Sequence, residues 1–240
     1  SDFRTELLMK RGRNYAAKIN HKRRKFNIMY SAQGFSCIYV LETILSWRIN
    51  KMKRHQQLIT SSLQCLDKIN FSNKTKLFIK LKLRGNILYK NYEYYLLPKL
   101  NLRNIKMGYI VDGILENYFD YIDLHIFDSM ATPLASSMAY NLPSIGFWDS
   151  NILTVKPQYE SLINRMIDVG MLVTNPDQLY ASVDKIYNNP LWWFENEVQE
   201  LRNEYVDLFS YCGNNWRGEL NNKLLSIIAD NHDKTIPKTL

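Results

Sequence analysis

Hydroxyl and carboxyl side chains gather in the middle of the chain, just after a run of apolar residues. The group consists of Asp128, Ser129, Thr132, Pro133, Ser136 and Ser137. A Thr-Pro pair is typical of a helix start, with threonine as the N-cap and proline at the first helical position. Because a helix start offers free N–H groups and about half a positive charge, this segment predicts a binding site for phosphate groups.

Backbone amides and hydroxyls could hold a phosphate here without a divalent cation. Asp128 does not suit a phosphate contact, because two negative groups repel each other. We expect its carboxylate to cap the helix or to hold a ribose or sugar hydroxyl. Asp120 and Asp123 do not form a DxD motif, and we assign no metal. An ordinary connection between a strand and a helix is the alternative for the whole segment.

A second candidate contact lies near the start of the chain. Residues 26–30 are apolar and predict a strand, and Ser31 and Gly34 lie in the turn that follows. Residues 35–66 then show a helical pattern, which completes the outline of a nucleotide-binding βα unit. The turn lacks GxGxxG and a P-loop lysine, so it either approaches a ligand or is a plain tight turn.

A basic strand supplies the remaining candidates. Residues 77–84 alternate apolar and basic side chains, which is the period of a strand with one charged face. Lys80, Lys82 and Arg84 would form a cationic wall for a phosphate or carboxylate. The alternative is an edge strand protected by lysines.

The elements that position these residues alternate between strands and helices. Further strands are expected at 105–111, 122–127, 145–148 and 171–173, and further helices at 114–121, 132–140, 159–169, 177–188 and from 194 to about 211. Asn141 and Gly170 are placed to end two of the helices in the left-handed conformation. The pattern predicts an α/β fold, with a Rossmann-like parallel sheet and helices on both faces. In such a sheet the helix beginning at Thr132 starts at the carboxyl edge, where anionic ligands bind.

Composition and charge limit the partners. The formal charge of +8 favours an anionic partner, and residues 1–25 form a basic linker or helix before a domain at 26–230 and a tail at 231–240. The three cysteines form neither a CxxC nor a metal pattern, which indicates free thiols in a reducing, cytoplasmic compartment. Residues 4–25 could contact the inner face of a membrane. The motifs HExxH, GxSxG and the P-loop are absent, and His125 lies in an apolar strand, as a core histidine would.

Residues 105–210 resemble the C-terminal, donor-binding domain of GT-B glycosyltransferases. The stretch DSMATPLASSMAYNLPSIGFW (128–148) is similar to their donor-binding turn and helix, and GMLVTNPDQLYASVDKIYNNP (170–190) to their common ending. Together with LWWFENEVQELRNEYVDLF (191–209), the pattern looks closest to a bacterial family of surface-polysaccharide transferases. That family is related to the retaining β-Kdo transferases, which use CMP-Kdo.

This resemblance implies that the first group of residues, together with Ser31, surrounds a nucleotide-sugar donor, while Lys80, Lys82 and Arg84 face its phosphate or the carboxylate of its sugar. It implies no other cofactor. The glutamate with which many GT-B enzymes hold a ribose is missing, because Ser136 or Ser137 occupies that region. The departure disfavours a UDP- or GDP-sugar and favours CMP, although the His-Pro pair of several CMP-sugar enzymes is also absent. A GT-B enzyme needs two lobes, so the acceptor lobe, the site for a glycan or lipid-linked acceptor and the catalytic residue would lie on a missing N-terminal half.

Two other readings use different features of the chain. The charge, the basic start and the many tyrosines would suit a nucleic-acid-binding α/β protein. A non-catalytic scaffold could pair with a partner through Trp192 and Trp193, although adjacent tryptophans serve equally well as a buried anchor.

Overall fold

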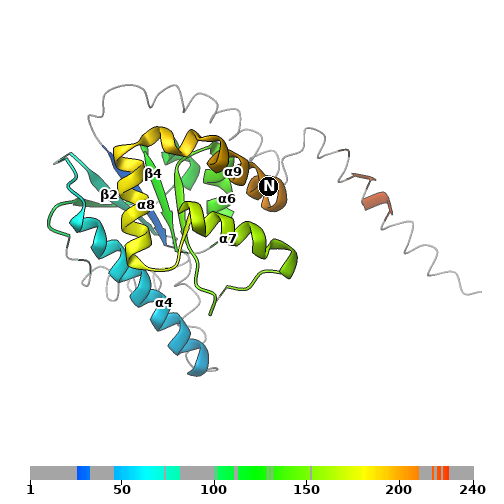
Figure 1. The fold of residues 1–240 in the computed structure, drawn as a ribbon, viewed down its shortest axis with the longest axis horizontal. Coiled ribbons are helices and arrows are strands. Elements are labelled where there is room, and N and C mark those ends of the chain that lie inside the picture. The colour runs from blue at the N-terminus through cyan, green and yellow to red at the C-terminus, as the bar shows by residue number, and fades with distance from the viewer. Residues whose placement is uncertain are drawn as a thin grey trace, which may run out of the picture.

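A parallel sheet forms the centre of the computed structural model (Figure 1). It has six strands in the order β3-β2-β1-β4-β5-β6. The strands are β1 (Asn27–Ala32), β2 (Lys76–Leu81), β3 (Lys106–Ile110), β4 (Leu124–Phe127), β5 (Ser144–Phe147) and β6 (Leu172–Val173). The structure describes residues 26–32, 46–72, 74–81, 100, 102–110, 113–128, 130, 132–151, 153–210, 218, 221–222 and 224–226. The basic segment 1–25, the tail 231–240, Lys82, Arg84 and Ser129 therefore lie outside the described residues.

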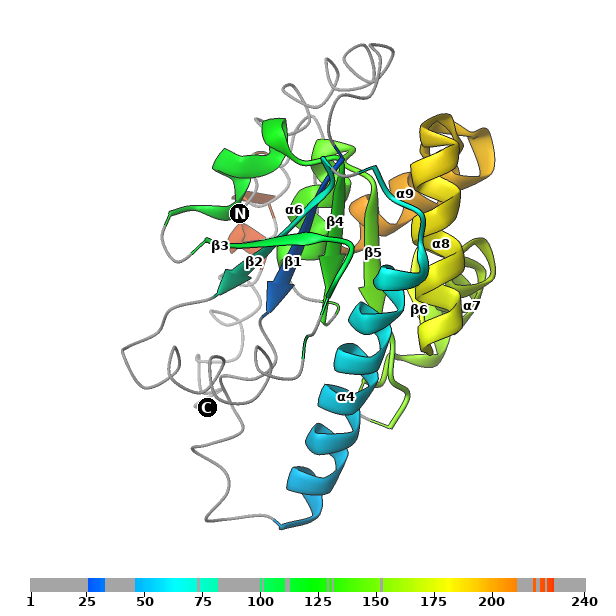
Figure 2. The same cartoon turned by 90° about the vertical axis from the view of Figure 1, so that its left-hand side faces the viewer.

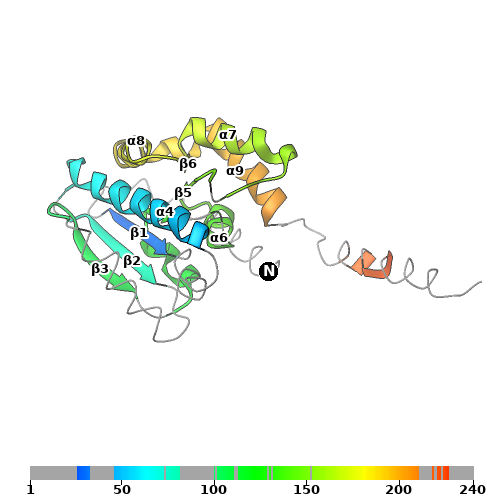
Figure 3. The ribbon, with the colours of Figure 1, turned by 90° about the horizontal axis from the view of Figure 1, so that it is seen from below.

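Helices cover both faces of the sheet. They are α4 (Ser46–Cys65), α6 (Thr132–Tyr140), α7 (Glu160–Val169), α8 (Pro176–Asn188) and α9 (Asn196–Phe209), with 3-10 turns η2 (Leu66–Lys68), η4 (Leu115–Tyr121), η5 (Pro157–Tyr159) and η6 (Pro190–Phe194). Helices α4 and α8 pack together on one face, and α6, η4 and α9 pack together on the other (Figures 2 and 3). The side chains of β1 alternate accordingly: Ile28 and Tyr30 join the core that includes α4, while Met29 packs with Phe119 and Tyr140.

The predicted α/β class and its central crossover are confirmed. Strand β4, helix α6 and strand β5 follow one another as expected, and all adjacent strands pair in parallel. Asn141 has a φ of 61° directly after α6, and Gly170 has a φ of 89° directly after α7, so both helices end in the left-handed conformation. The side chain of Asn175 accepts a hydrogen bond from the Gln178 amide at the start of α8.

Two of the alternatives left open by the sequence are wrong. Strand β2 lies between β3 and β1, so Lys80 does not protect a sheet edge. Trp192 and Trp193 are 2% and 0% exposed, so they anchor η6 inside the protein and present no surface to a partner. Both errors have the same origin, because the neighbours of an element decide its exposure and are not visible in its own sequence.

Asn141 joins α6 to η6 and α9 in addition to ending its helix. Its Oδ1 accepts hydrogen bonds from Trp193 Nε1 at 2.8 Å and from Gln199 Nε2 at 3.0 Å. Its Nδ2 donates to Gln199 Oε1 at 3.1 Å. The Asn141 side chain thus provides the acceptor for the buried Trp193 indole and holds α9 against α6. The candidate site described below lies at the start of α6.

Substituting Asn141 should therefore destabilise the protein in two separable ways. Asn141→Ala places an alanine at positive φ and leaves the Trp193 indole without its acceptor, so we expect a loss of about 2–4 kcal/mol in the free energy of unfolding. Asn141→Gly removes the same hydrogen bonds but tolerates the backbone conformation, so its loss should be roughly 1 kcal/mol smaller. Urea unfolding of the original protein and the two variants measures the loss from the hydrogen bonds and the loss from the backbone conformation. Equal losses in the two variants would show that the backbone conformation contributes nothing.

Candidate functional site

The strand order reverses between β1 and β4. From β1 the chain moves outward through β2 to β3, and it returns to the other side of β1 with β4, β5 and β6. All strands end in the same direction, and the N-terminal half of α4 extends beyond the strand ends (Figure 2). Open parallel sheets bind ligands beyond the carboxyl ends of their strands at such a reversal. The residues that follow β1, β4 and β5 are therefore the candidates for a site.

Helix α6 starts at this reversal and presents part of the predicted phosphate site. Thr132 is exposed at its first position, Pro133 is buried beside it, and Ser136 is 8% exposed one turn later. Ser137 differs from the prediction, because it is fully buried and its hydroxyl donates to the Leu134 carbonyl at 3.0 Å. It also accepts from the Ser144 hydroxyl at 2.9 Å, so it joins α6 to β5 inside the protein.

Ser31 and Lys80 lie next to each other at the same edge. They are register partners on β1 and β2, and Ser31 is also the register partner of Phe127 on β4. Lys80 is half-buried, whereas Ser31 is only 3% exposed. The structure thus brings one residue of the predicted basic wall to the reversal point, next to the predicted βα turn.

Ser31 forms its hydrogen bond with a core histidine. The Ser31 hydroxyl lies 2.7 Å from His125 Nε2, and His125 is fully buried, as the sequence predicted. The other ring nitrogen, Nδ1, is also buried, and no described residue forms a hydrogen bond with it. Burial lowers the pKa of His125 well below its usual value of 6.5, so the ring stays neutral in the folded protein.

Asp128 follows β4 and is fully buried. Its backbone carbonyl accepts a hydrogen bond of 2.7 Å from His55 Nε2 of α4. This contact ties the turn before α6 to the helix on the opposite face of the sheet. The Asp128 side chain is thus buried inside the protein. Its predicted role, as a helix cap or as a contact to a ribose or sugar hydroxyl, stays a prediction.

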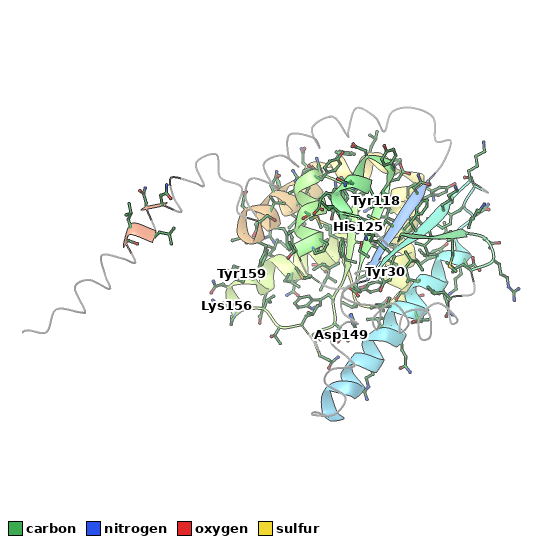
Figure 4. All side chains as sticks on the ribbon, turned by 180° about the vertical axis from the view of Figure 1, so that it is seen from behind. Tyr30, Tyr118, His125, Asp149, Lys156 and Tyr159 are labelled. Atoms are coloured by element: carbon green, nitrogen blue, oxygen red, sulfur yellow. The ribbon has the colours of Figure 1, made fainter. Side chains whose placement is uncertain are left out.

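His55 and Asp149 were missed by the sequence reasoning. His55 Nδ1 lies 3.7 Å from Asp149 Oδ2, and Asp149 follows β5 at the same edge, beside α4 (Figure 4). Asp149 Oδ1 accepts from the backbone amide of Asn151 at 2.9 Å and from its side chain at 3.0 Å. No local motif marks this pair, because its two members are 94 positions apart in the chain. Only the prediction that 145–148 is a strand pointed to Asp149, as a residue at the end of that strand.

The sequence matches the family described as LIC12162 family transferase over residues 14–224. The chain belongs to this transferase family. It has no match among curated proteins.

Several solved structures are similar to this member of the LIC12162 transferase family. Sucrose-phosphate synthase from Thermosynechococcus elongatus is 13% identical with a TM-score of 0.49, over 90% of this chain and 49% of that chain. The C-terminal domain of a glycosyl transferase group 1 family protein from Francisella tularensis is 14% identical with a TM-score of 0.39, over 81% of this chain and 91% of that chain. Accessory secretory protein 1, 2 and 3 from Streptococcus pneumoniae gives 10% identity and a TM-score of 0.44, over 86% of this chain and 35% of that chain.

This chain thus spans about half of the sucrose-phosphate synthase that it matches. Because all three TM-scores lie below 0.5, the assignment of the fold rests on the order and direction of the strands.

Two negative findings apply to the described part of this transferase. No three His, Cys, Asp or Glu side chains there are arranged to hold a metal ion, and the absence of a metal from the reaction stays a prediction. None of the described helices combines the length and the apolar character that a bilayer crossing requires. Of the predicted site residues that it describes, the structure places Ser31, Lys80, Asp128, Thr132, Pro133 and Ser136 around the reversal.

The burial of His125 should make stability depend on pH. The unfolded chain takes up a proton on this residue below about pH 6.5, whereas the folded protein resists it. Stability is therefore complete above that pH and falls as the pH drops, by up to about 1.4 kcal/mol per pH unit from this residue. His125→Gln cannot take up the proton, so its free energy of unfolding should fall less steeply between pH 6.5 and 5. Urea unfolding across this range compares the two slopes, and identical slopes would contradict a neutral buried ring.

Proposed function

We propose that this chain is the donor-binding part of a GT-B glycosyltransferase and that it binds a nucleotide sugar at the reversal between β1 and β4. The observation that carries the proposal is the start of α6 at that reversal, with Thr132 exposed and Lys80 next to Ser31 on the neighbouring strands. Membership in a transferase family supports it. The resemblance of residues 105–210 to GT-B donor domains specifies the class of donor.

The proposed chemistry is stabilisation of a leaving phosphate. In glycosyl transfer, the bond between the sugar carbon and the phosphate oxygen breaks, and the acceptor hydroxyl oxygen bonds to the carbon and loses its proton. The bonding electrons remain on the nucleotide phosphate. Free N–H groups at the start of α6, the Thr132 hydroxyl and the Lys80 ammonium group would stabilise that charge without a metal. Groups that the fold holds in place before transfer would need little reorganisation as the charge develops.

The proposed donor is a CMP-linked sugar of the Kdo type, and the product is a bacterial surface polysaccharide or lipopolysaccharide. The proposed acceptor is a glycan or a lipid-linked glycan, bound by a second lobe that also supplies the catalytic residue. Residues 4–25 would bring the enzyme to the inner face of a membrane, because basic segments are attracted to anionic lipids. These proposals rest on the resemblance and on the charge of the sequence.

Nucleotide binding is the direct test of the site. A ligand at 100 times its dissociation constant adds about 2.7 kcal/mol to the free energy of unfolding, so CMP, UMP or GMP at millimolar concentration should raise the melting temperature. The double variant Thr132→Val with Ser136→Ala should abolish the rise. Ser61→Ala is a matched control. Ser61 is exposed on α4, its recognised hydrogen bonds within the described residues go to carbonyls of its own helix, and the variant should leave the rise unchanged.

The same assay separates donor binding from nucleic-acid binding, which the charge of +8 also suits. If single nucleotides have no effect and only DNA or RNA raises the melting temperature, with affinity that falls steeply with salt, the proposal is wrong.

Transfer should require the second lobe. We expect the 240-residue chain to bind its nucleotide but to transfer no sugar from CMP-Kdo to a glycan acceptor, because the catalytic residue is proposed to lie elsewhere. A radiolabelled transfer assay measures this directly. Turnover by this chain alone would refute the division into two lobes and leave the proposed nucleotide site intact.

A further inference from the structure

Of the two ring nitrogens of His55, one forms a hydrogen bond and the other has no hydrogen-bond partner among the described residues. Its Nε2 lies 2.7 Å from the Asp128 carbonyl oxygen, and a carbonyl can only accept, so Nε2 carries the proton. In the neutral ring Nδ1 is then an acceptor. That atom is buried and has no hydrogen-bond partner within the described part of the chain, while the residue as a whole is only 8% exposed.

Asp149 places a second acceptor next to this nitrogen. Its Oδ2 lies 3.7 Å from His55 Nδ1, which is too long for a hydrogen bond, and no hydrogen bond to Oδ2 is recorded among the described residues. Oδ1 is held by Asn151, so the orientation of the carboxylate is fixed. With a neutral ring, two neighbouring acceptors therefore face each other, and none of the described residues donates a hydrogen bond to either atom.

Leaving a buried polar atom without a partner costs free energy, and such an atom in a folded protein calls for an explanation. A group with two donors answers it, because one hydrogen can point to His55 Nδ1 and the other to Asp149 Oδ2. Two adjacent hydroxyl groups on a sugar ring have this chemistry. The position agrees, since His55 holds the turn that leads into α6 and Asp149 ends the neighbouring strand.

We propose that His55 and Asp149 form a recognition site for the vicinal diol of the ribose, so that the protein selects ribonucleotides over 2′-deoxyribonucleotides. The inference deepens the proposed function and rests on it, because it assigns the part of the nucleotide that lies beyond the phosphate. Asp149 and His55 would perform the task for which the sequence offers no glutamate on α6.

The test compares CMP, UMP and GMP, each with its 2′-deoxy counterpart, by isothermal titration on the 240-residue chain. The ribonucleotide that binds should do so about 10- to 100-fold more tightly than its deoxy form, as expected for one hydrogen bond to a charged acceptor. Equal binding of the two forms would overturn this inference and leave the proposed function standing. Binding of no nucleotide would overturn both.

Asp149→Asn is the decisive variant. Its amide oxygen can still accept from Asn151, while the amide NH2 replaces Oδ2, so the fold is retained but the second acceptor becomes a donor. We expect the preference for the ribonucleotide to fall close to 1, with the affinity for the deoxy form unchanged. Asp184→Asn is the matched control: it makes the same change of charge on α8, where the Asp184 carboxylate accepts from Asn188 of its own helix, and it should keep the preference.

An exocyclic amine on the base is the other common group with two donors. If the site holds the cytosine amine, Asp149→Asn will abolish a preference for CMP over UMP and leave the preference for ribose untouched. That result would overturn the assignment of the diol. Loss of the ribose preference alone would support the diol. The original protein and Asp149→Asn, each with the ribonucleotide and its deoxy form, give four affinities, and this double-mutant cycle isolates the interaction between Asp149 and the 2′-hydroxyl.

Discussion

The pairing of β1 with β4 is the constraint on which the site depends. At the start of the pair, the Asn27 amide donates to Asp123 Oδ2 at 2.7 Å, and near its end Ser31 and His125 are joined by a hydrogen bond of 2.7 Å. These contacts join positions that are 96 and 94 residues apart in the sequence. A shift of one residue would turn Ser31 and His125 to opposite faces of the sheet, so the bond favours a single register. Because α6 follows β4, the same register also places the start of α6 near the end of β1.

Much of the fold follows from local chemistry and could be predicted from the sequence. Asn141 and Gly170 end their helices at the predicted places, because the signal lies in the backbone geometry of a few residues. Thr132-Pro133 marks the start of α6, although the helix includes Thr132 as its first residue and does not begin after it as an N-cap would require. The apolar runs around Ile126 and Ile145 identified the two strands that enclose α6. Each signal depends on the chain within one turn or strand, which explains why it can be recognised without knowing the tertiary structure.

The parts that could not be predicted depend on contacts across the fold. Whether β2 lies at an edge depends on β3, which follows it by some 25 residues. The rotation of α6 decides that Ser136 is near the surface and that Ser137 points inward to Ser144, although both residues read equally well as candidates. His55 approaches Asp149 only because α4 crosses the ends of β4 and β5, so no spacing in the sequence could reveal the pair.

Hydrogen bonds between buried polar groups determine where α6 lies in this protein. The Ser137 and Ser144 hydroxyls bond to each other at 2.9 Å and thereby fix α6 against β5. His55 holds the turn before α6 from the other face. Because buried polar groups are costly when they lose their partners, these bonds disfavour other placements of the helix start.

The charges at the reversal distinguish between kinds of anionic ligand. A helix start and Lys80 attract a phosphate, but Asp149 lies at the same edge and repels one. A continuous polyanion would have to pass that carboxylate, whereas a single nucleotide presents a phosphate at one end and neutral hydroxyl donors at the other. An arrangement with both signs of charge therefore suits a nucleotide sugar better than a nucleic-acid backbone, even though the chain as a whole carries a formal charge of +8. In the proposed site, the overall charge would govern attraction at long range, and the local pattern of acceptors and donors would govern which anion binds.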